Sequence, residues 1–215
     1  MTNYQAVIFD LDGVIVSTDE YHYLAWKHIA DQEGIYFDRT INHRMRGVSR
    51  MVSLDIMLER AKREYSQTEK LMLSEQKNTY YVNFLENITP ADILPGVQTL
   101  LNELRKRDIK MAIASSSRNT PLILKQIGLD NFFDAVADGN QIKNTKPDPE
   151  VFLLAAKLLD IQPTLCIVVE DAMAGIEAAN RAGTKAVAVG NAAAGENVDY
   201  GVPSLDRLDI DLFLK

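Results

Sequence analysis

Two aspartates one residue apart, Asp10 and Asp12, follow the apolar run Ala6-Val7-Ile8-Phe9 and precede Gly13. An apolar run that ends at such a turn predicts a buried strand. In an open α/β sheet, ligands bind beyond the carboxyl ends of the strands, so Asp10 is expected at the mouth of a site. If the backbone stays extended, Asp12 projects to the same side. One carboxylate can then act as nucleophile or metal ligand while the other gives and takes a proton.

Two later strand ends carry groups that would suit a phosphate and a metal ion. The run 109–114 predicts a strand followed by Ser115-Ser116-Ser117 and a helix that begins near Asn119, so hydroxyl and backbone N–H groups could cradle a phosphate. The strand Leu165–Val169 ends in Glu170 and Asp171. Carboxylate oxygens are the ligands that Mg²⁺ prefers, which favours a site shared with Asp10.

A lysine follows the short predicted strand 135–137. Lys146 stands in Lys146-Pro147-Asp148-Pro149, where Asp148 can cap a helix whose first residue is Pro149. The lysine is thereby held on a stiff loop, where it can neutralise phosphate oxygens and carboxylates near a metal.

Each group has a simpler interpretation when it is taken alone. Asp and Gly mark turns, hydroxyl runs are ordinary loop composition, loop lysines are usually solvated, and acids often cap helices. Four strand ends with complementary groups are poorly explained by coincidence. In this order they resemble the four motifs of the haloacid dehalogenase superfamily, which comprises mostly phosphatases and phosphomutases; the matching residues are Asp10, Asp12, Ser115, Lys146, Glu170 and Asp171.

The resemblance implies a role for each of these residues. Asp10 would be the nucleophile that becomes an aspartyl phosphate, and Asp12 the general acid and base. Mg²⁺ would be held by Asp10, the backbone carbonyl of Asp12 and Asp171, with Glu170 reaching it through water. The phosphate-binding residues on the sheet side would be Ser115, Ser116 and Lys146.

Between the first acid pair and the second strand the sequence predicts helices and no strand. Helical patterns begin at Thr18-Asp19-Glu20, near Ser49 and near Gln67, and the last extends to Glu86. Predicted strands lie on both sides of this stretch, at 6–9, 109–114, 135–137, 165–169 and 185–190. We therefore expect an α/β fold with a Rossmann-like parallel-sheet core, residues 1–15 and 88–215, and an inserted all-helical cap, residues 16–87. The segment Asn191–Ser204 is expected to be irregular.

The helical insertion carries its own candidate residues. Arg50 lies at a predicted helix start, where acids are more usual, so it could bind an anion together with the helix N-terminus; an exposed surface arginine is the alternative. His22 and Trp26 share one helical face. For Trp26, burial in a core or interface is the alternative.

These residues resemble the cap of the β-phosphoglucomutase family within the same superfamily. The resemblance implies interconversion of β-D-glucose 1-phosphate and D-glucose 6-phosphate through a bisphosphate, with Arg50 clamping the second phosphate. A phosphatase acting on sugar phosphates or phosphoglycolate is the alternative, and a catalytically silent binding protein a further one. The chain departs from the family at Ser17, where an acid is usual, and at Asn144-Thr145. The implied substrate-binding residues are Thr18, His22, Trp26, Gly47, Val48, Ser49, Ser53, Lys77, Ser117 and Asn119.

Composition excludes several classes of protein. The 215 residues carry 23 basic and 30 acidic side chains, for a net charge of −7, and no basic run of the kind that binds nucleic acid. The single cysteine, Cys166, lies in an apolar run and is expected to be buried rather than reactive. The N-terminus shows no leader pattern, and no apolar run approaches about 18 residues. We expect a cytoplasmic protein with no membrane partner and a small-molecule sugar phosphate as ligand, and the resemblance implies a monomer.

Overall fold

The computed structural model describes residues 4–214, and its centre is a parallel sheet. The strands are ordered β3-β2-β1-β4-β5-β6, and each neighbouring pair is parallel. Residues 1–3 and 215 belong to the predicted core but lie outside the described residues. The predicted Rossmann-type parallel sheet is confirmed. The strands are β1 (Ala6–Phe9), β2 (Lys110–Ala114), β3 (Ala135–Ala137), β4 (Cys166–Glu170), β5 (Lys185–Val189) and β6 (Tyr200–Val202).

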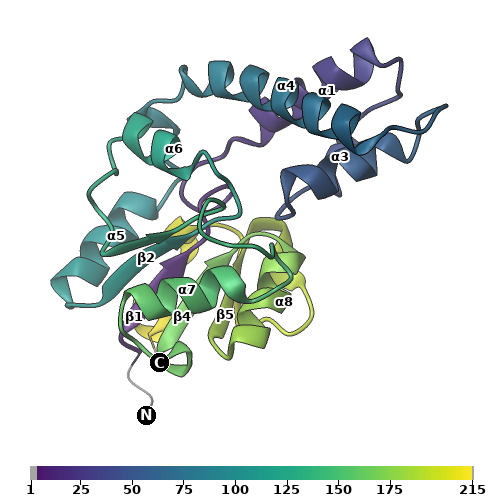
Figure 1. The fold of residues 1–215 in the computed structure, drawn as a ribbon. Coiled ribbons are helices and arrows are strands. Elements are labelled where there is room, and N and C mark those ends of the chain that lie inside the picture. The colour runs from purple at the N-terminus through teal and green to yellow at the C-terminus, as the bar shows by residue number, and fades with distance from the viewer. Residues whose placement is uncertain (1–3, 215) are drawn as a thin grey trace.

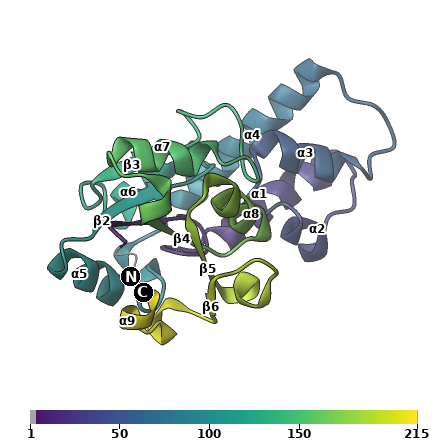
Figure 2. The ribbon, with the colours of Figure 1, turned by 90° about the horizontal axis from the view of Figure 1, so that it is seen from below.

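Helices cover both faces of this sheet (Figure 2). Val7 and Phe9 of β1 pack with helices α5 (Val97–Lys106), α6 (Thr120–Gln126) and α9 (Ile210–Phe213). Ala6 and Ile8 point the other way, into a cluster with α7 (Glu150–Leu158) and α8 (Met173–Ala182). Burial on both faces explains why the central strands read as continuous apolar runs rather than alternating ones. Short 3₁₀ helices connect these elements: η1 (Pro90–Asp92), η2 (Pro163–Leu165), η3 (Gly190–Ala194) and η4 (Leu205–Arg207).

The stretch between β1 and β2 is helical, as predicted, and lies to one side of the sheet (Figure 1). It contains α1 (Asp19–Gln32), α2 (Arg39–His43), α3 (Arg50–Leu58) and α4 (Gln67–Leu85). These helices enclose an apolar cluster of their own that includes Trp26, Leu54 and Met57. Tyr81 and Leu85 of α4 pack instead into the core of the sheet. The exact domain boundaries at 16 and 87 stay a prediction.

The two connections between the helical segment and the sheet run side by side. Val16 forms an antiparallel bridge with Ile93, and the N–H of Leu94 donates to the carbonyl of Ile15 at 2.9 Å. The chain therefore leaves the sheet and returns to it at one place.

Helix starts follow the sequence in some places and depart from it in others. The Ser49 hydroxyl caps α3 by accepting from Val52 N–H at 3.2 Å. Thr18 precedes α1 but makes no cap bond, because its hydroxyl donates to Asp12 instead. The helix predicted to start at Pro149 begins one residue later, with Pro149 in the cap position.

Strand β6 lies in the segment 191–204, which was predicted to be irregular; that prediction is wrong. The strand has three residues and a glycine at its centre, and a Cβ on Gly201 would lie 2.0 Å from the carbonyl oxygen of Ala193. Close approach of two backbones requires glycine here, and glycine weakens any strand pattern in a sequence.

Two other expectations concern burial and membranes. Cys166 is fully buried, as predicted, and burial raises the pKa of its thiol to about 11. Within residues 4–214, none of the helices has the length and apolar character needed to cross a bilayer.

Two glycines with left-handed backbones allow a test of close packing in this fold. Gly34 (φ +66°) has open space around it, whereas a Cβ on Gly96 (φ +85°) would lie 2.2 Å from the backbone nitrogen of Asp206. Alanine in this region costs about 1 kcal/mol by itself, and displacing a packed backbone adds about 2 kcal/mol. Gly96→Ala should therefore lower the free energy of urea unfolding by clearly more than Gly34→Ala. Equal losses would contradict the close contact between Gly96 and η4.

Candidate active site

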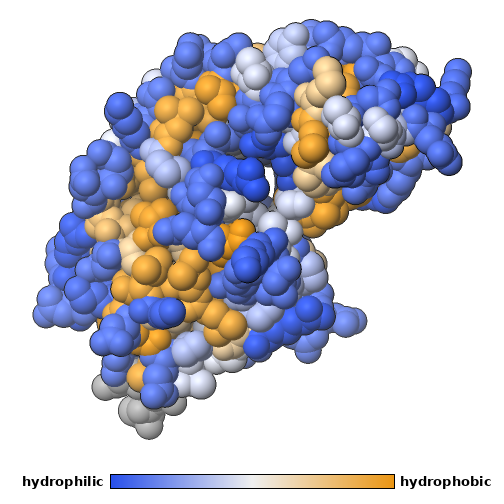
Figure 3. All heavy atoms as spheres, viewed as in Figure 1, coloured by the Kyte–Doolittle hydropathy of each residue, from blue (hydrophilic) through white to orange (hydrophobic). Residues whose placement is uncertain are grey.

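A cleft of about 1100 Å³ separates the helical segment from the carboxyl edge of the sheet. The space-filling view shows a hollow between these two parts of the molecule (Figure 3). The structure brings nearly every predicted site residue to the cleft wall; the two exceptions are Thr18 and Glu170, which lie behind it.

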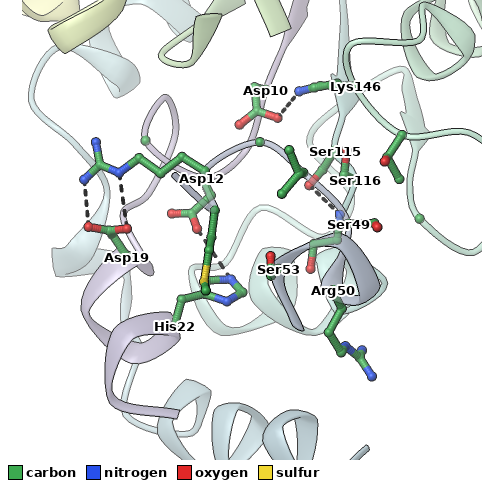
Figure 4. Close-up of a pocket in the computed structure, with 18 of the residues that line it drawn as sticks. Asp10, Asp12, Asp19, His22, Ser49, Arg50, Ser53, Ser115, Ser116 and Lys146 are labelled. Atoms are coloured by element: carbon green, nitrogen blue, oxygen red, sulfur yellow. Dashed lines mark hydrogen bonds and ion pairs between the residues drawn. The ribbon is translucent and has the colours of Figure 1, made fainter. Parts of the chain in front are cut away.

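Asp10 directly follows β1, the strand between β2 and β4, and is buried. The Lys146 ammonium donates to Asp10 Oδ1, to Glu170 Oε2 at 2.7 Å and to the carbonyl of Ala114 at 3.3 Å (Figure 4). One buried lysine thus joins the ends of three neighbouring strands. The carboxylates Asp10 and Glu170 raise the pKa of Lys146 above its usual value even though burial opposes this, so the lysine stays charged.

Three carboxylates form a cluster suited to a hard cation. One oxygen each of Asp10, Glu170 and Asp171 lies within 4.8 Å of the others. Glu170 Oε1 is fixed by the N–H groups of Asp171 and Ala172, both at 3.0 Å. All the side-chain donors are oxygens, which fits Mg²⁺ or Ca²⁺ rather than a softer metal.

Two glycines make room for this cluster. A Cβ on Gly13 (φ +89°) would lie 2.2 Å from Asp171 Oδ2, and one on Gly175 would lie 2.0 Å from Glu170 Cδ. Any side chain at either position would collide with a carboxylate. Residue 13, which follows Asp12, must therefore be glycine because the carboxylate of Asp171 occupies the space of a side chain.

The crowding changes the acidity of these groups. Burial raises the pKa of Asp171 to about 9, with further contributions from Glu170 and Asp10. Burial also raises the pKa of Asp10 to about 7, opposed by Lys146. Asp171 and Asp10 therefore hold protons more readily than free carboxyl groups do unless a cation offsets their charge, which is a second reason to expect a divalent ion here.

Asp12 is held in a different environment. Its Oδ1 accepts from Thr18 N–H and its Oδ2 from the Thr18 hydroxyl, both at 2.6 Å, while His22 Nε2 lies 3.7 Å from Oδ2. Burial raises the pKa of Asp12, and the bonds from Thr18 oppose the rise. A carboxyl group balanced in this way can hold and release a proton. Thr18 is fully buried, faces Asp12 and the Tyr81 hydroxyl (2.8 Å), and orients Asp12 from behind the cleft wall. Its predicted role in substrate binding stays a prediction.

The cap side of the cleft carries basic groups. Lys77 is almost fully buried and lies over the rings of Trp26 and Tyr81, with its Nζ 2.6 Å from His22 Nδ1. Burial, reinforced by Arg50, holds the pKa of Lys77 well below its usual value, and the pKa of His22 is also lowered well below its usual value by burial and by both cations. Arg50 donates to Glu75 at 2.9 Å.

The hydroxyl run forms a tight turn between β2 and α6. The hydroxyl of Ser115 accepts from Ser117 N–H at 3.1 Å, and that of Ser117 accepts from Asn119 N–H at 3.2 Å. The buried hydroxyl of Ser116 has no hydrogen-bond partner among the described residues. This turn therefore offers polar groups to a ligand. The amide of Asn119 donates to Asn78 of α4 at 2.9 Å and so links the two sides of the cleft.

A family model for haloacid dehalogenase-like hydrolases matches residues 4–183 of the chain. The chain belongs to this family. The predicted family membership is thereby confirmed.

Individual relatives give a more specific picture within the haloacid dehalogenase-like family. The chain is 45% identical to a β-phosphoglucomutase of Bacillus subtilis, over 97% of this chain and 93% of that protein. A crystal structure of β-phosphoglucomutase from Clostridium difficile superposes with a TM-score of 0.92 at 42% identity, covering 98% of this chain and 95% of the other. A phosphorylated carbohydrates phosphatase of Thermotoga maritima is 32% identical, over 85% of this chain and 83% of that protein.

Several residues of this haloacid dehalogenase-like site were missed by sequence reasoning. Tyr81 stacks on His22 with ring centroids 4.0 Å apart, and its position four residues after Lys77 could have revealed it. Arg118 lines the cleft within the serine-rich turn. Asp19 and Arg46 form an ion pair across 27 residues, and no local pattern predicts such a pairing.

The raised pKa values of Asp171 and Asp10 predict how the affinity for a divalent cation should depend on pH. A bound cation must displace protons from Asp171 and Asp10, whose folded pKa values of about 9 and about 7 lie above the ordinary 3.8. Mg²⁺ affinity measured by calorimetry should therefore rise between pH 6 and pH 9, by about tenfold or more. A flat profile would contradict the crowding of the carboxylates.

The same shift of Asp171 can be checked without metal. A raised folded pKa means that the folded state binds more protons than the unfolded one, so this stability is complete below about pH 4 and is lost as the pH rises through about 9. The unfolding free energy of the parent should therefore fall relative to that of Asp171→Asn as the pH rises over this range, because the variant cannot titrate at position 171.

Proposed function

We propose that this chain is a Mg²⁺-dependent β-phosphoglucomutase, which interconverts β-D-glucose 1-phosphate and D-glucose 6-phosphate through a bisphosphate intermediate. The observation that carries the proposal is that two anion-binding groups face one cleft: Lys146 beside Asp10 on the sheet side, and Arg50 on the cap side. A substrate with a phosphate at either end fits such a cleft. The similarity over nearly the full length to the β-phosphoglucomutase of Bacillus subtilis supports the same reading.

In the first half-reaction the Asp10 carboxylate attacks the phosphorus of the bisphosphate. The bond between phosphorus and the sugar oxygen breaks, Asp12 gives that oxygen its proton, and Asp10 carries the phosphoryl group. In the second half-reaction a molecule of β-D-glucose 1-phosphate binds and Asp12 takes the proton from its 6-hydroxyl. That oxygen attacks the phosphorus of the aspartyl phosphate, the bond from phosphorus to the Asp10 oxygen breaks, and the bisphosphate forms again. The position of Asp12 between Thr18 and His22 keeps its carboxyl group directed in both steps.

The remaining groups of the sheet side would hold the phosphoryl group in transit. Lys146 supplies a fixed positive charge, and the Ser115 and Ser116 hydroxyls supply polar contacts. Mg²⁺, bound by Asp10, Asp171 and the backbone carbonyl of Asp12 with Glu170 acting through water, would offset the negative charge of the phosphoryl group and of the carboxylates. The cluster of oxygen donors at Asp10, Glu170 and Asp171 supports this assignment.

On the cap side, Arg50 would bind the phosphate that does not react, exchanging Glu75 for it. The sugar would lie against residues of the cleft wall, while the cap, residues 16–87, closes over it and excludes water. A mutase and a phosphatase form the same aspartyl phosphate and differ in whether the sugar or water takes the phosphoryl group from it. Exclusion of water therefore favours the mutase reaction. The predicted sugar-contacting residues that line the cleft are His22, Trp26, Gly47, Val48, Ser49, Ser53, Lys77, Ser117 and Asn119.

We also propose a monomeric protein of the cytoplasm with no nucleic-acid or membrane partner. The net charge of −7 supports the first exclusion.

The proposal is tested by following two products in one tube. With Mg²⁺, β-D-glucose 1-phosphate and a trace of the bisphosphate, glucose 6-phosphate should form in large excess over free phosphate. Asp10→Asn should abolish both products, because the nucleophile is lost. Free phosphate in excess would identify a phosphatase, as in the Thermotoga maritima relative. If neither glucose 6-phosphate nor free phosphate forms, the proposed substrate is wrong.

Arg50 is tested against a matched arginine of the same segment. Arg50→Ala should reduce mutase turnover by about 100-fold, because a charged contact to the second phosphate is lost, while phosphorylation of Asp10 by a small acyl phosphate should continue. Arg44 pairs with Glu59 at 2.7 Å, is half exposed and lies outside the cleft. Arg44→Ala should therefore behave like the parent. Equal effects of the two variants, measured by coupled assay for glucose 6-phosphate, would remove Arg50 from the binding site.

A further inference from the structure

An ion pair at the edge of the cleft has no place in the chemistry above. Asp19, the first residue of α1, accepts from Arg46 through both carboxylate oxygens, from Nη2 at 2.7 Å and from Nε at 3.3 Å. The buried amide of Asn42 donates to the same carboxylate at 3.2 Å. In Figure 4 two dashed lines join the carboxylate of Asp19 to a guanidinium group, near Asp12 and His22. Both partners of the pair are about one third exposed, which makes it one of the more enclosed ion pairs of the helical segment.

The loop that carries Arg46 touches the sheet side of the cleft. Gly47 lies so close to the start of α8 that a Cβ there would be 3.3 Å from the Cβ of Ala172. Ala172 directly follows Asp171, and its N–H holds Glu170. Arg46 also lies within the electrostatic influence of Asp171 and Asp12, which raise the pKa of its guanidinium after the larger contribution of Asp19.

The same loop leads directly into the candidate phosphate clamp. Arg46 and Arg50 lie on either side of a turn in which Gly47 has φ +75° and Ser49 caps α3. The glycine gives the backbone of this turn more conformational freedom than another residue would. The bonds from Arg46 to Asp19 tie the turn to α1.

We infer that Arg46, held by Asp19, is a positioning residue that keeps the loop 46–50 docked on the start of α8 and so excludes water from the phosphorylated Asp10. This inference rests on the proposed function in one respect: it requires that Asp10 becomes phosphorylated. The reaction that the loop prevents is hydrolysis, in which a water oxygen bonds to phosphorus, the bond from phosphorus to the Asp10 oxygen breaks, and inorganic phosphate and a carboxylate result. A loop that shields this bond favours transfer to the sugar.

The neighbouring residue of α1 provides a matched control. Glu20 forms a similar bidentate ion pair with Arg39, at 2.6 and 3.0 Å. Both side chains are more than half exposed, and neither lines the cleft. Glu20→Gln and Asp19→Asn make the same chemical change one residue apart. A general effect of loosening the cap would appear in both variants.

The first measurement is the lifetime of the phosphorylated enzyme. The protein is loaded with a small acyl phosphate in the presence of Mg²⁺ and without sugar, and the decay of the aspartyl phosphate is followed. Asp19→Asn and Arg46→Lys should shorten the lifetime by about tenfold, since a displacement of about 1 Å in a closing group has effects of this order or larger. Glu20→Gln should match the parent. Equal lifetimes in all four proteins would overturn the inference.

The second measurement needs neither metal nor turnover. Hydrogen exchange of the backbone amides in residues 46–50 should be faster in Asp19→Asn than in Glu20→Gln if the pair anchors the loop. Equal hydrogen exchange in the two variants would show that the pair of Asp19 and Arg46 does not anchor the loop, even if the lifetime of the aspartyl phosphate changed.

The two proposals fail in different ways. If the parent yields free phosphate rather than glucose 6-phosphate, the mutase proposal fails, yet the ratio of lifetimes still reports on Arg46. If glucose 6-phosphate dominates in the parent and the aspartyl phosphate decays equally fast in the parent and in Asp19→Asn, the mutase proposal stands and the role of Arg46 is excluded.

Discussion

The buried ammonium of Lys146 is the interaction on which the site depends. Asp10 and Glu170 end adjacent parallel strands, so the sheet itself forces two carboxylates into one dry pocket. Two buried negative charges would repel each other and would each lose their solvation. Lys146 contacts both, and through the carbonyl of Ala114 it also reaches the next strand. The pocket can therefore keep reactive carboxylates in place before any ligand arrives.

A second feature of the charge distribution follows from this arrangement. The sheet side gathers acids, and the cap side gathers Lys77, Arg50 and Arg46. Lys77 is packed against the rings of Trp26 and Tyr81, and burial lowers its pKa, with a further contribution from the charge of Arg50. A dianionic ligand that enters the cleft would restore the charge of such a lysine. With Lys146 on the sheet side and Arg50 on the cap side, the cleft has a cation on each side for a ligand that carries a phosphate at either end.

Much of this architecture could be predicted from the sequence because it depends on local patterns. The strands β1, β2 and β4 are apolar runs with acids or hydroxyls at their ends, and the sheet brings those ends together. Strand β6 was missed because three residues with a central glycine carry almost no pattern. Thr18 was expected to bind substrate because the family resemblance implied it, and no sequence pattern indicated that its hydroxyl would donate to Asp12. The pairing of Asp19 with Arg46 depends on how α1 and the loop before α3 meet in space, and no spacing rule encodes it.

The bridge between Val16 and Ile93 brings the two chain connections of the helical segment together at one place. The chain leaves the sheet after β1 and comes back beside its own point of departure, so everything between these two residues is an insertion into a structure that could close without it. The sheet, its register and its acids make few demands on what is inserted. Lineages of such proteins can therefore lengthen, shorten or exchange the inserted helices and acquire new substrates while the phosphoryl-transfer apparatus stays as it was.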